Sequence, residues 1–207
     1  MSMFFTFLIA AVVLAVTPGP GIAYVVARTV AGGRTEGLAS CLGTGIGGMV
    51  HVIAAALGLS ALIAQSAAAF TVVKWVGVAY LVYLGLRMLL GQTHVSALPT
   101  VRAQGPARAL REGILVEVLN VKTAMFFLAF LPQFVTPGQP LIAQLVTLGT
   151  ICVALNTLVD VVAVLAADRL LQSSARREAR SRLMRRISGM TMLGLGAWLA
   201  LAERPRV

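Results

Sequence analysis

Three charged side chains stand out inside the long apolar stretches of this chain: Glu117, Lys122 and Asp160. On insertion scales, a charged side chain at the centre of a bilayer costs about 2.5–3.5 kcal/mol, so it usually faces a partner or a water-filled cavity. Such groups can relay protons or bind the charged groups of a substrate. For two of them a structural role is the alternative: Lys122 pairs with a carboxylate, and Glu117 extends to the membrane surface.

Asparagine side chains accompany these charges at helical spacing. Asn156 and Asp160 are four residues apart, and Glu117 and Asn120 are three apart, so each pair shares one face of a helix. Lys122 does not share the face of Asn120, because two residues correspond to about 200° of rotation on a regular helix. Either Lys122 faces elsewhere or the helix is irregular around Asn120.

The first apolar run is interrupted by the sequence TPGP, from Thr17 to Pro20. Proline removes a backbone donor and clashes with the preceding helical turn. In lipid, such a break is tolerated only where protein or a water-filled cavity satisfies the freed backbone groups. It exposes helix ends that can hold a zwitterion, as in many transporters; a kink that serves packing alone is the alternative. Pro132 interrupts the end of a later apolar run.

Small residues and a histidine recur in the second apolar run. Gly43, Gly47 and His51 follow one another at four-residue steps, which places them on one helical face. The glycines are typical of a close helix–helix contact of the GxxxG type. His51 is either a core histidine with satisfied hydrogen bonds or a proton carrier.

The composition indicates that lipid surrounds the chain. Of its 207 residues, 58% are hydrophobic and 12% are charged, against roughly 45–50% and about 25% in soluble domains. The net charge of +10 comes from arginines between the apolar runs, which is typical of cytoplasmic loops rather than of nucleic-acid binding. Cys41 and Cys152 lie in apolar stretches without a CxxC motif, and two histidines are too few for a metal tract. We predict no metal, no cofactor and no nucleic-acid partner.

Six stretches are long and apolar enough to cross a bilayer core about 30 Å thick as helices. We therefore predict an all-α integral membrane protein, with residues 1–207 forming a single polytopic membrane domain. The first stretch lacks a positive n-region and continues past Pro20, so we expect a retained helix rather than a cleaved signal peptide. The predicted spans are 3–27, 38–64, 71–90, 113–135, 141–166 and 187–202.

The charges of the connections predict the orientation. Connections 28–37, 87–112 and 168–186 carry most of the arginines, whereas 65–70 and 136–140 carry no charge. Since basic loops face the cytoplasm, the first, third and fifth connections are expected inside and both termini outside. Each half has three spans and begins with a proline-interrupted one, which predicts two inverted three-helix repeats with the substrate site between them.

Taken together, the motifs resemble the LysE/RhtB family of lysine and homoserine/threonine exporters. The resemblance rests on TPGP, GGRTEGLASCLGTGIGGMVH, KWVGVAYLVYLGLRML, LNVKTAMFFLAFLPQFV and ISGMTMLGLGAWLAL, in this order along nearly the whole chain. It implies an exporter of amino acids or close derivatives in the bacterial inner membrane, driven by the proton motive force. The family commonly has PGPN and NPK, where this chain has Gly21 and Val121. Without the proline we expect a straighter fourth helix, and without the asparagine one polar group fewer beside the unwound segment.

These observations combine into one working hypothesis. Backbone groups of the unwound segment and Lys122 bind the substrate carboxylate, while Asn120 and Asp160 bind its amine. Asp160, Glu117 or His51 changes protonation as the halves of the protein rock. The predicted ligands are Thr17, Pro18, Gly19, Pro20, Gly21, Asn120, Lys122 and Asp160.

The expected partners are an amino-acid-like substrate, protons and membrane lipids, with a possible homodimer, and we expect no enzymatic activity. Two other classes of function are open: a membrane-embedded enzyme acting on lipid or a small metabolite, and a non-transporting assembly protein. An enzyme needs convergent carboxylates, a Ser/His pair or a metal site, and no motif groups such residues at ligand spacing. Polar residues deep in the spans argue against a purely structural protein.

Overall fold

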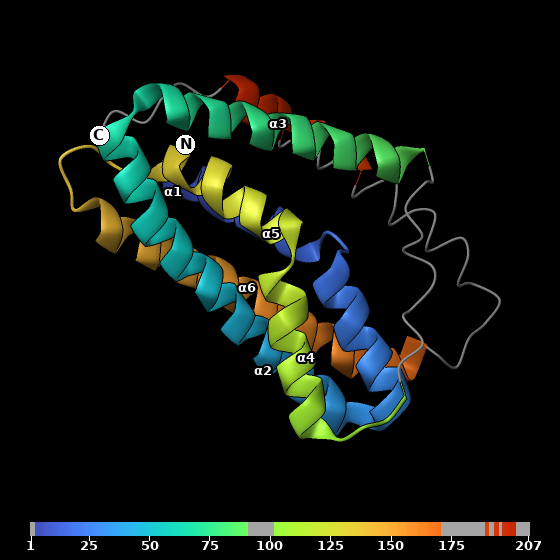
Figure 1. The fold of residues 1–207 in the computed structure, drawn as a ribbon. Coiled ribbons are helices and arrows are strands. Elements are labelled where there is room, and N and C mark those ends of the chain that lie inside the picture. The colour runs from blue at the N-terminus through green and yellow to red at the C-terminus, as the bar shows by residue number, and fades with distance from the viewer. Residues whose placement is uncertain (1–2, 91–101, 171–188, 191–192, 195, 202–207) are drawn as a thin grey trace.

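The computed structural model describes residues 3–90, 102–170, 189–190, 193–194 and 196–201. Within these residues the chain is helical and has no strands, which confirms the predicted all-α fold. The helices are α1 (Met3–Val16), α2 (Pro20–Gln65), α3 (Ala67–Leu89), α4 (Pro106–Val118), α5 (Val121–Met125) and α6 (Leu141–Leu170). A π-helical turn (Phe126–Phe130) and a 3-10 turn (Leu131–Phe134) that contains Pro132 extend the path of α5. The described C-terminal residues lie beside α3 (Figure 1).

Three described helices, Pro20–Ala61, Ala68–Arg87 and Leu141–Ala167, are each long and apolar enough to cross a membrane. The last two agree closely with the predicted spans 71–90 and 141–166, whereas Pro20–Ala61 runs from the first predicted span into the second. Pro106–Val118 and Val121–Phe134 add a fourth crossing if they count as one span bent by 45°, and α1 is a shorter apolar helix of 14 residues. Parts of the predicted sixth span and nearly all of connection 168–186 lie outside the described residues. The six-span count and the inverted repeats therefore stay predictions.

No loop separates the first predicted span from the second, because α2 runs through the predicted connection 28–37. Within α2 only Gly33 leaves helical geometry, with φ 73° and ψ −172°. Glycine adopts positive φ readily because it lacks a Cβ atom. A single residue thus redirects the helix, and Arg28, which we expected in a solvated loop, is fully buried.

α2 connects the parts of the fold, because it packs along both α4 and α6. Its glycine face lies against α4: a Cβ atom at Gly47 would lie 2.7 Å from the carbonyl oxygen of Ile114. Elsewhere, the largest apolar cluster joins α1, the end of α2, the turns after α5, and α6. Phe7, Leu59, Phe130 and Leu145 are among its fully buried members.

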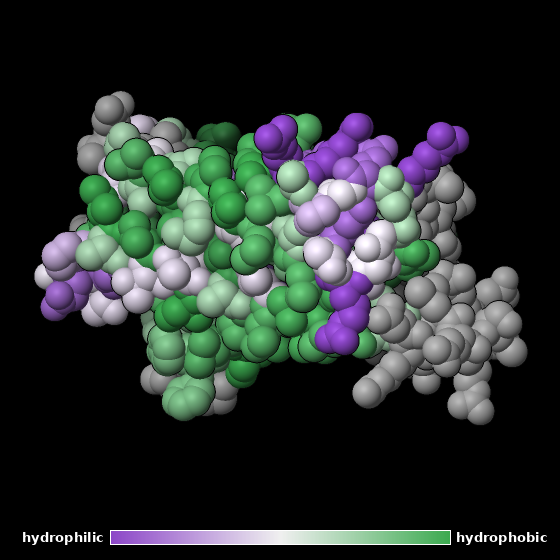
Figure 2. All heavy atoms as spheres, turned by 90° about the horizontal axis from the view of Figure 1, so that it is seen from below, coloured by the Kyte–Doolittle hydropathy of each residue, from purple (hydrophilic) through white to green (hydrophobic). Residues whose placement is uncertain are grey.

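The outer surface of the molecule is largely apolar. Large exposed hydrophobic side chains occur on α1, α2, α3 and α6, and include Phe5, Leu42, Leu57, Val72 and Leu158. On the face shown in Figure 2, apolar side chains cover the middle and hydrophilic side chains gather toward the two ends. Soluble proteins rarely expose apolar patches of this extent, so this surface fits contact with lipid.

Candidate functional site

Two breaks in the helices lie against each other: one separates α1 from α2, and the other separates α4 from α5. Lys122 of α5 is 6% exposed and bridges them. Its Nζ donates to the carbonyl oxygens of Leu14 (3.3 Å) and Thr17 (2.9 Å). The last carbonyl groups of a helix have no partners within it and carry partial negative charge. The ammonium group therefore stabilises the broken end of α1.

Asn120 shapes the second break. Its Oδ1 accepts a hydrogen bond from the backbone N–H of Lys122 (3.1 Å), and its Nδ2 donates to Oε2 of Glu117 (3.0 Å). The helix is thus irregular at Asn120, and this irregularity brings Lys122 into the region of Glu117. The expectation that Val121 straightens this helix is wrong, because the segments on either side of the break are bent by 45°. An asparagine side chain caps the new helix here without any help from proline.

Glu117 does not extend to the membrane surface, since it is only 2% exposed. Its Oε1 accepts a hydrogen bond from Oγ1 of Thr123 (2.6 Å), and its Oε2 accepts the bond from Asn120. A Cβ atom at Gly21 would lie 2.8 Å from Oε2, so the carboxylate faces the first turn of α2. The partial positive charge of a helix N-terminus favours a carboxylate there. Both helix ends at the first break thus face an opposite charge, Lys122 at the end of α1 and Glu117 at the start of α2.

His51 lies on the glycine face of α2 and supports the end of α4. Its Nε2 lies 2.8 Å from the backbone carbonyl oxygen of Glu117. A carbonyl oxygen only accepts, so Nε2 carries a proton and donates it in this bond. Gly43 and Gly47 lie on the same side, against α4.

Asp160 of α6 has an incomplete set of hydrogen bonds. The residue is 2% exposed, and its Oδ2 accepts a hydrogen bond from Oγ1 of Thr44 (2.9 Å). Its Oδ1 accepts none from the part of the chain that the structure describes, and no other buried side-chain nitrogen or oxygen atom of that part lacks a partner. A buried oxygen without a hydrogen bond costs about 1–3 kcal/mol, so this atom is placed to receive a ligand or a proton.

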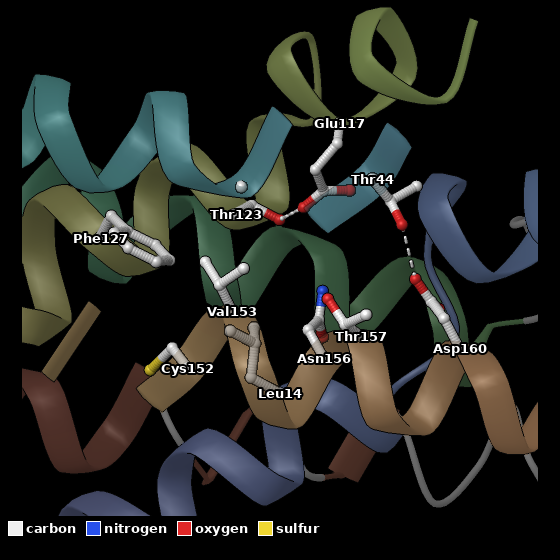
Figure 3. Close-up of a pocket in the computed structure, with 11 residues that line it drawn as sticks. Leu14, Thr44, Glu117, Thr123, Phe127, Cys152, Val153, Asn156, Thr157 and Asp160 are labelled. Atoms are coloured by element: carbon white, nitrogen blue, oxygen red, sulfur yellow. Dashed lines mark hydrogen bonds between the residues drawn. The ribbon is translucent and has the colours of Figure 1, made fainter. Parts of the chain in front are cut away.

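A narrow cavity lies between α2, the α4–α5 break and α6, and the carboxylates of Glu117 and Asp160 both line it (Figure 3). Its volume of about 10 Å³ has room for about one water molecule. An amino acid does not fit, so substrate entry requires these helices to move apart. The lining residues are Leu14, Thr44, Gly48, Glu117, Thr123, Phe127, Cys152, Val153, Asn156, Thr157 and Asp160. We call this space the Asp160 cavity.

The structure brings some predicted site residues together more closely than others. Asp160 and Glu117 line the Asp160 cavity. Lys122 and Asn120 adjoin it through the bonds described above, but they are not among its lining residues, and neither are residues 17–21. Of the predicted ligands and proton carriers, Glu117 and Asp160 line the cavity, whereas Asn120, Lys122 and residues 17–21 form the helix breaks beside it.

Sequence reasoning missed the hydroxyl groups of the cavity, those of Thr44, Thr123 and Thr157. Threonine is common in apolar helices, where its hydroxyl often bonds a carbonyl of the preceding turn, so spacing alone does not mark these three. It also missed Lys74 of α3, which is 7% exposed. The signal for Lys74 was available, because it is a charge within an apolar run like that of Lys122.

A second buried group of charges surrounds Arg28, at the end of α4 away from the break. The guanidinium of Arg28 donates to the hydroxyl of Tyr24 (2.9 Å), to Oε2 of Glu36 (3.4 Å), to the carbonyl oxygen of Arg102 (3.0 Å) and to Oε2 of Glu112. Oε1 of Glu36 accepts from the backbone N–H groups of residues 104 and 105, just before α4 begins. We call Tyr24, Arg28, Glu36 and Glu112 the Arg28 cluster. It ties both parts of α2 to α4.

Comparison with known proteins places this chain among membrane transporters. It is 31% identical over 197 residues to an "Uncharacterized membrane protein" of Vibrio cholerae, covering 95% of this chain and 96% of that protein. It is 29% identical over 155 residues to the "Homoserine/homoserine lactone efflux protein" of Salmonella typhimurium, covering 75% of each. It is 26% identical over 212 residues to the "Leucine efflux protein" of Klebsiella pneumoniae, covering 97% of this chain and 95% of that protein.

No solved structure matches the chain significantly. The model of the family described as LysE type translocator, in contrast, matches residues 12–203. This match covers both helix breaks, all four residues of the Arg28 cluster and the whole lining of the Asp160 cavity. The chain therefore belongs to the LysE type translocator family.

Proposed function

We propose that this protein exports amino acids or close derivatives across the bacterial inner membrane, driven by the proton motive force. Membership of a translocator family supports transport rather than catalysis. Two relatives named for homoserine, homoserine lactone and leucine efflux support a substrate with an amino group. The observation that carries the proposal is the buried Oδ1 of Asp160, which has no hydrogen bond from the described residues.

Asp160 is the group that binds the substrate ammonium and a proton in turn. A carboxylate with one free oxygen in a buried cavity can receive either cation, and the two cations then compete for a single site. Competition of this kind couples an inward proton to an outward substrate. The other titratable groups around the cavity are Glu117, Lys122, His51, Cys41 and Cys152. Glu117 and Lys122 face helix ends, His51 bonds to backbone, and the two cysteines are buried free thiols.

The remaining predicted ligands act by position. Lys122 connects the two helix breaks through the carbonyl oxygen of Thr17, and Asn120 holds the break between α4 and α5 in shape. Residues 17–21 form the other break. Because helix breaks can change direction with little loss of packed surface, they are suitable hinges for the opening that the closed cavity requires. The halves then alternate between an opening to the cytoplasm and an opening to the outside.

An efflux assay tests this proposal. Cells that contain the protein are loaded with dipeptides of homoserine or leucine, and the release of the free amino acid is followed over time. We expect faster release than from cells without the protein, and we expect Asp160→Asn to abolish the difference while the protein stays in the membrane at its normal level. Thr150→Val is the matched control, because Thr150 is exposed on the same helix and its hydroxyl bonds Val146.

Normal export by Asp160→Asn would reject the assignment to Asp160. No export of any loaded amino acid by the folded wild-type protein would reject the proposed function, and would favour a membrane-embedded enzyme or an assembly protein.

We also propose the orientation that the arginines predict, with the basic connections in the cytoplasm and both termini outside. Single cysteines at the exposed positions Ala107 and Thr136 test this orientation. Ala107 lies in the first turn of α4, within the basic connection 87–112, and Thr136 lies in the uncharged connection 136–140. In whole cells, an impermeant maleimide should label Thr136→Cys and spare Ala107→Cys. The opposite labelling would reverse the orientation. Cross-linking in the membrane tests the homodimer.

A further inference from the structure

We infer that the Asp160 cavity recognises its substrate by the ammonium group and selects amines whose carboxyl group is uncharged, such as the amides, esters and lactones of amino acids, over free amino acids. This inference rests on the proposed function and specifies which charged groups the preferred substrate carries.

The charge of the cavity lining is the first support. Two carboxylates line the cavity, those of Glu117 and Asp160, and no lysine or arginine is among its lining residues. The ammonium of Lys122, the cation beside it, already donates to two carbonyl oxygens at the end of α1. A substrate ammonium therefore meets an opposite charge in this cavity, whereas a substrate carboxylate meets no positive charge among the lining residues.

The order of groups along the cavity is the second support. Cys152, Asn156 and Asp160 follow one another at four-residue steps, so they line one face of α6 over about 12 Å. Figure 3 shows Asp160 with Thr44 at one end and Phe127 with Cys152 at the other. An ammonium bound at Asp160 therefore directs the rest of the molecule along this face toward the apolar end.

The middle of the cavity decides between a charged and a neutral carboxyl group. Glu117 faces this part of the cavity, and both of its oxygens already accept hydrogen bonds, from Thr123 and Asn120. A substrate carboxylate there would lie beside a second carboxylate, and like charges in a buried site repel each other strongly. A neutral carbonyl avoids this repulsion and can accept a hydrogen bond from the amide of Asn156 or the hydroxyl of Thr157.

Lys122 provides the opposing possibility. If its ammonium leaves one carbonyl of α1 when the cavity opens, it can neutralise a substrate carboxylate, and free amino acids are then preferred. The broken end of α1 would lose a hydrogen bond in that case. The two possibilities predict opposite orders of affinity, so binding measurements distinguish them.

The test uses matched compounds on the purified full-length protein in detergent. L-leucine carries both charges, L-leucinamide carries the ammonium alone, and 4-methylpentanoate carries the carboxylate alone; L-homoserine and homoserine lactone form a second pair. Binding is measured by the increase in thermal stability with ligand concentration. We expect leucinamide and the lactone to bind at least about tenfold more tightly than the free amino acids, and 4-methylpentanoate not to bind.

Two variants sharpen the test. Asp160→Asn should lose affinity for every amine. Glu117→Gln removes the negative charge beside the carboxyl group, so it should improve leucine relative to leucinamide by at least about tenfold. Thr150→Val should bind as the wild type does.

Equal or tighter binding of the free amino acids by the wild type would overturn the inference and leave the proposed export intact. An unchanged ratio in a folded Glu117→Gln variant would also overturn it. If no amine binds and none is exported, the proposed function falls together with the inference.

Discussion

The Arg28 cluster and the Asp160 cavity differ in how completely the hydrogen bonds of their charged groups are formed. In the Arg28 cluster, the guanidinium donates to a hydroxyl, a backbone carbonyl and two carboxylates, and Glu36 accepts from two backbone N–H groups as well. In the Asp160 cavity, Oδ2 of Asp160 accepts a single hydrogen bond from Thr44, and Oδ1 of Asp160 accepts none from the described residues. A complete network stabilises one arrangement of the helices, whereas an incomplete one is open to a ligand.

Glu117 and Lys122 lie between these two extremes. Glu117 lines the Asp160 cavity and Lys122 adjoins it, yet each faces a helix end that its charge stabilises. Charge in a membrane span is therefore not sufficient evidence for a binding role. The number of hydrogen-bonding positions left open separates Asp160 from the other two. The following predictions test this distinction, beginning with the largest expected effect.

The largest effect is expected for the Arg28 cluster. Arg28→Ala leaves Glu36 buried without its cation, and breaking a buried ion pair in this way typically costs about 3–5 kcal/mol. We expect the variant to unfold at a clearly lower temperature, measured by size-exclusion chromatography after heating in detergent. Glu112→Gln is the matched control. Because the Glu112 side chain is 34% exposed, removing its negative charge should lower the free energy of unfolding by about 1 kcal/mol or less. Unchanged melting of Arg28→Ala would contradict a structural role for the cluster.

The opposite pattern is expected at Asp160. Asparagine has the same shape and still accepts the hydrogen bond from Thr44, so Asp160→Asn should change the free energy of unfolding by less than about 1 kcal/mol. Export should nevertheless fall at least a hundredfold, a loss of about 2.7 kcal/mol in transition-state stabilisation. Export per folded molecule is the quantity to measure. A loss of export that merely follows a loss of folded protein would make Asp160 structural, like Arg28.

Lys122 should combine both kinds of effect. Lys122→Met removes the ammonium donor from the carbonyl oxygens of Leu14 and Thr17, of which the Leu14 oxygen still accepts from the backbone N–H of Thr17. A hydrogen bond from a charged group is worth about 1.5–3 kcal/mol. We expect a stability loss of this order by the same heating assay. Lys122→Gln should recover part of it, because an amide N–H can donate to one of the two carbonyls. If Lys122→Gln melts no higher than Lys122→Met, the ammonium does not act through these carbonyls.

The residues Glu117, Asn156 and Asp160 of the cavity could be singled out from the sequence, because charged and amide side chains are rare in apolar spans. Helical spacing correctly associated Asn156 with Asp160, and both line the cavity. The Arg28 cluster could not be predicted in this way. Arg28 follows the end of a predicted span, and a charge at such a place is typical of a solvated loop. The acidic partners of Arg28, Glu36 and Glu112, come from two other segments.

The roles of individual charges were also hidden from sequence reasoning. Lys122 and Glu117 are five residues apart, and only the crossing of the two helix breaks places one at the end of α1 and the other at the start of α2. On a regular helix, Lys122 would point away from the face of Asn120. The break at Asn120, which no spacing rule predicts, brings Lys122 and Glu117 to the same helix break.

The smallest expected effect concerns the break between α4 and α5. Val121 occupies the first position of α5, where the backbone N–H has no partner within the helix and proline is well tolerated. Asn120 has φ −76° and ψ 97°, an extended conformation that a following proline favours. We therefore expect Val121→Pro to change the free energy of unfolding by less than about 0.5 kcal/mol and to leave export unchanged. Asn120→Ala should cost about 1 kcal/mol, because it removes the cap of α5 and one hydrogen bond to Glu117. Should Val121→Pro destabilise the protein more than Asn120→Ala, the bend would depend on the backbone N–H of residue 121 and not on the asparagine cap.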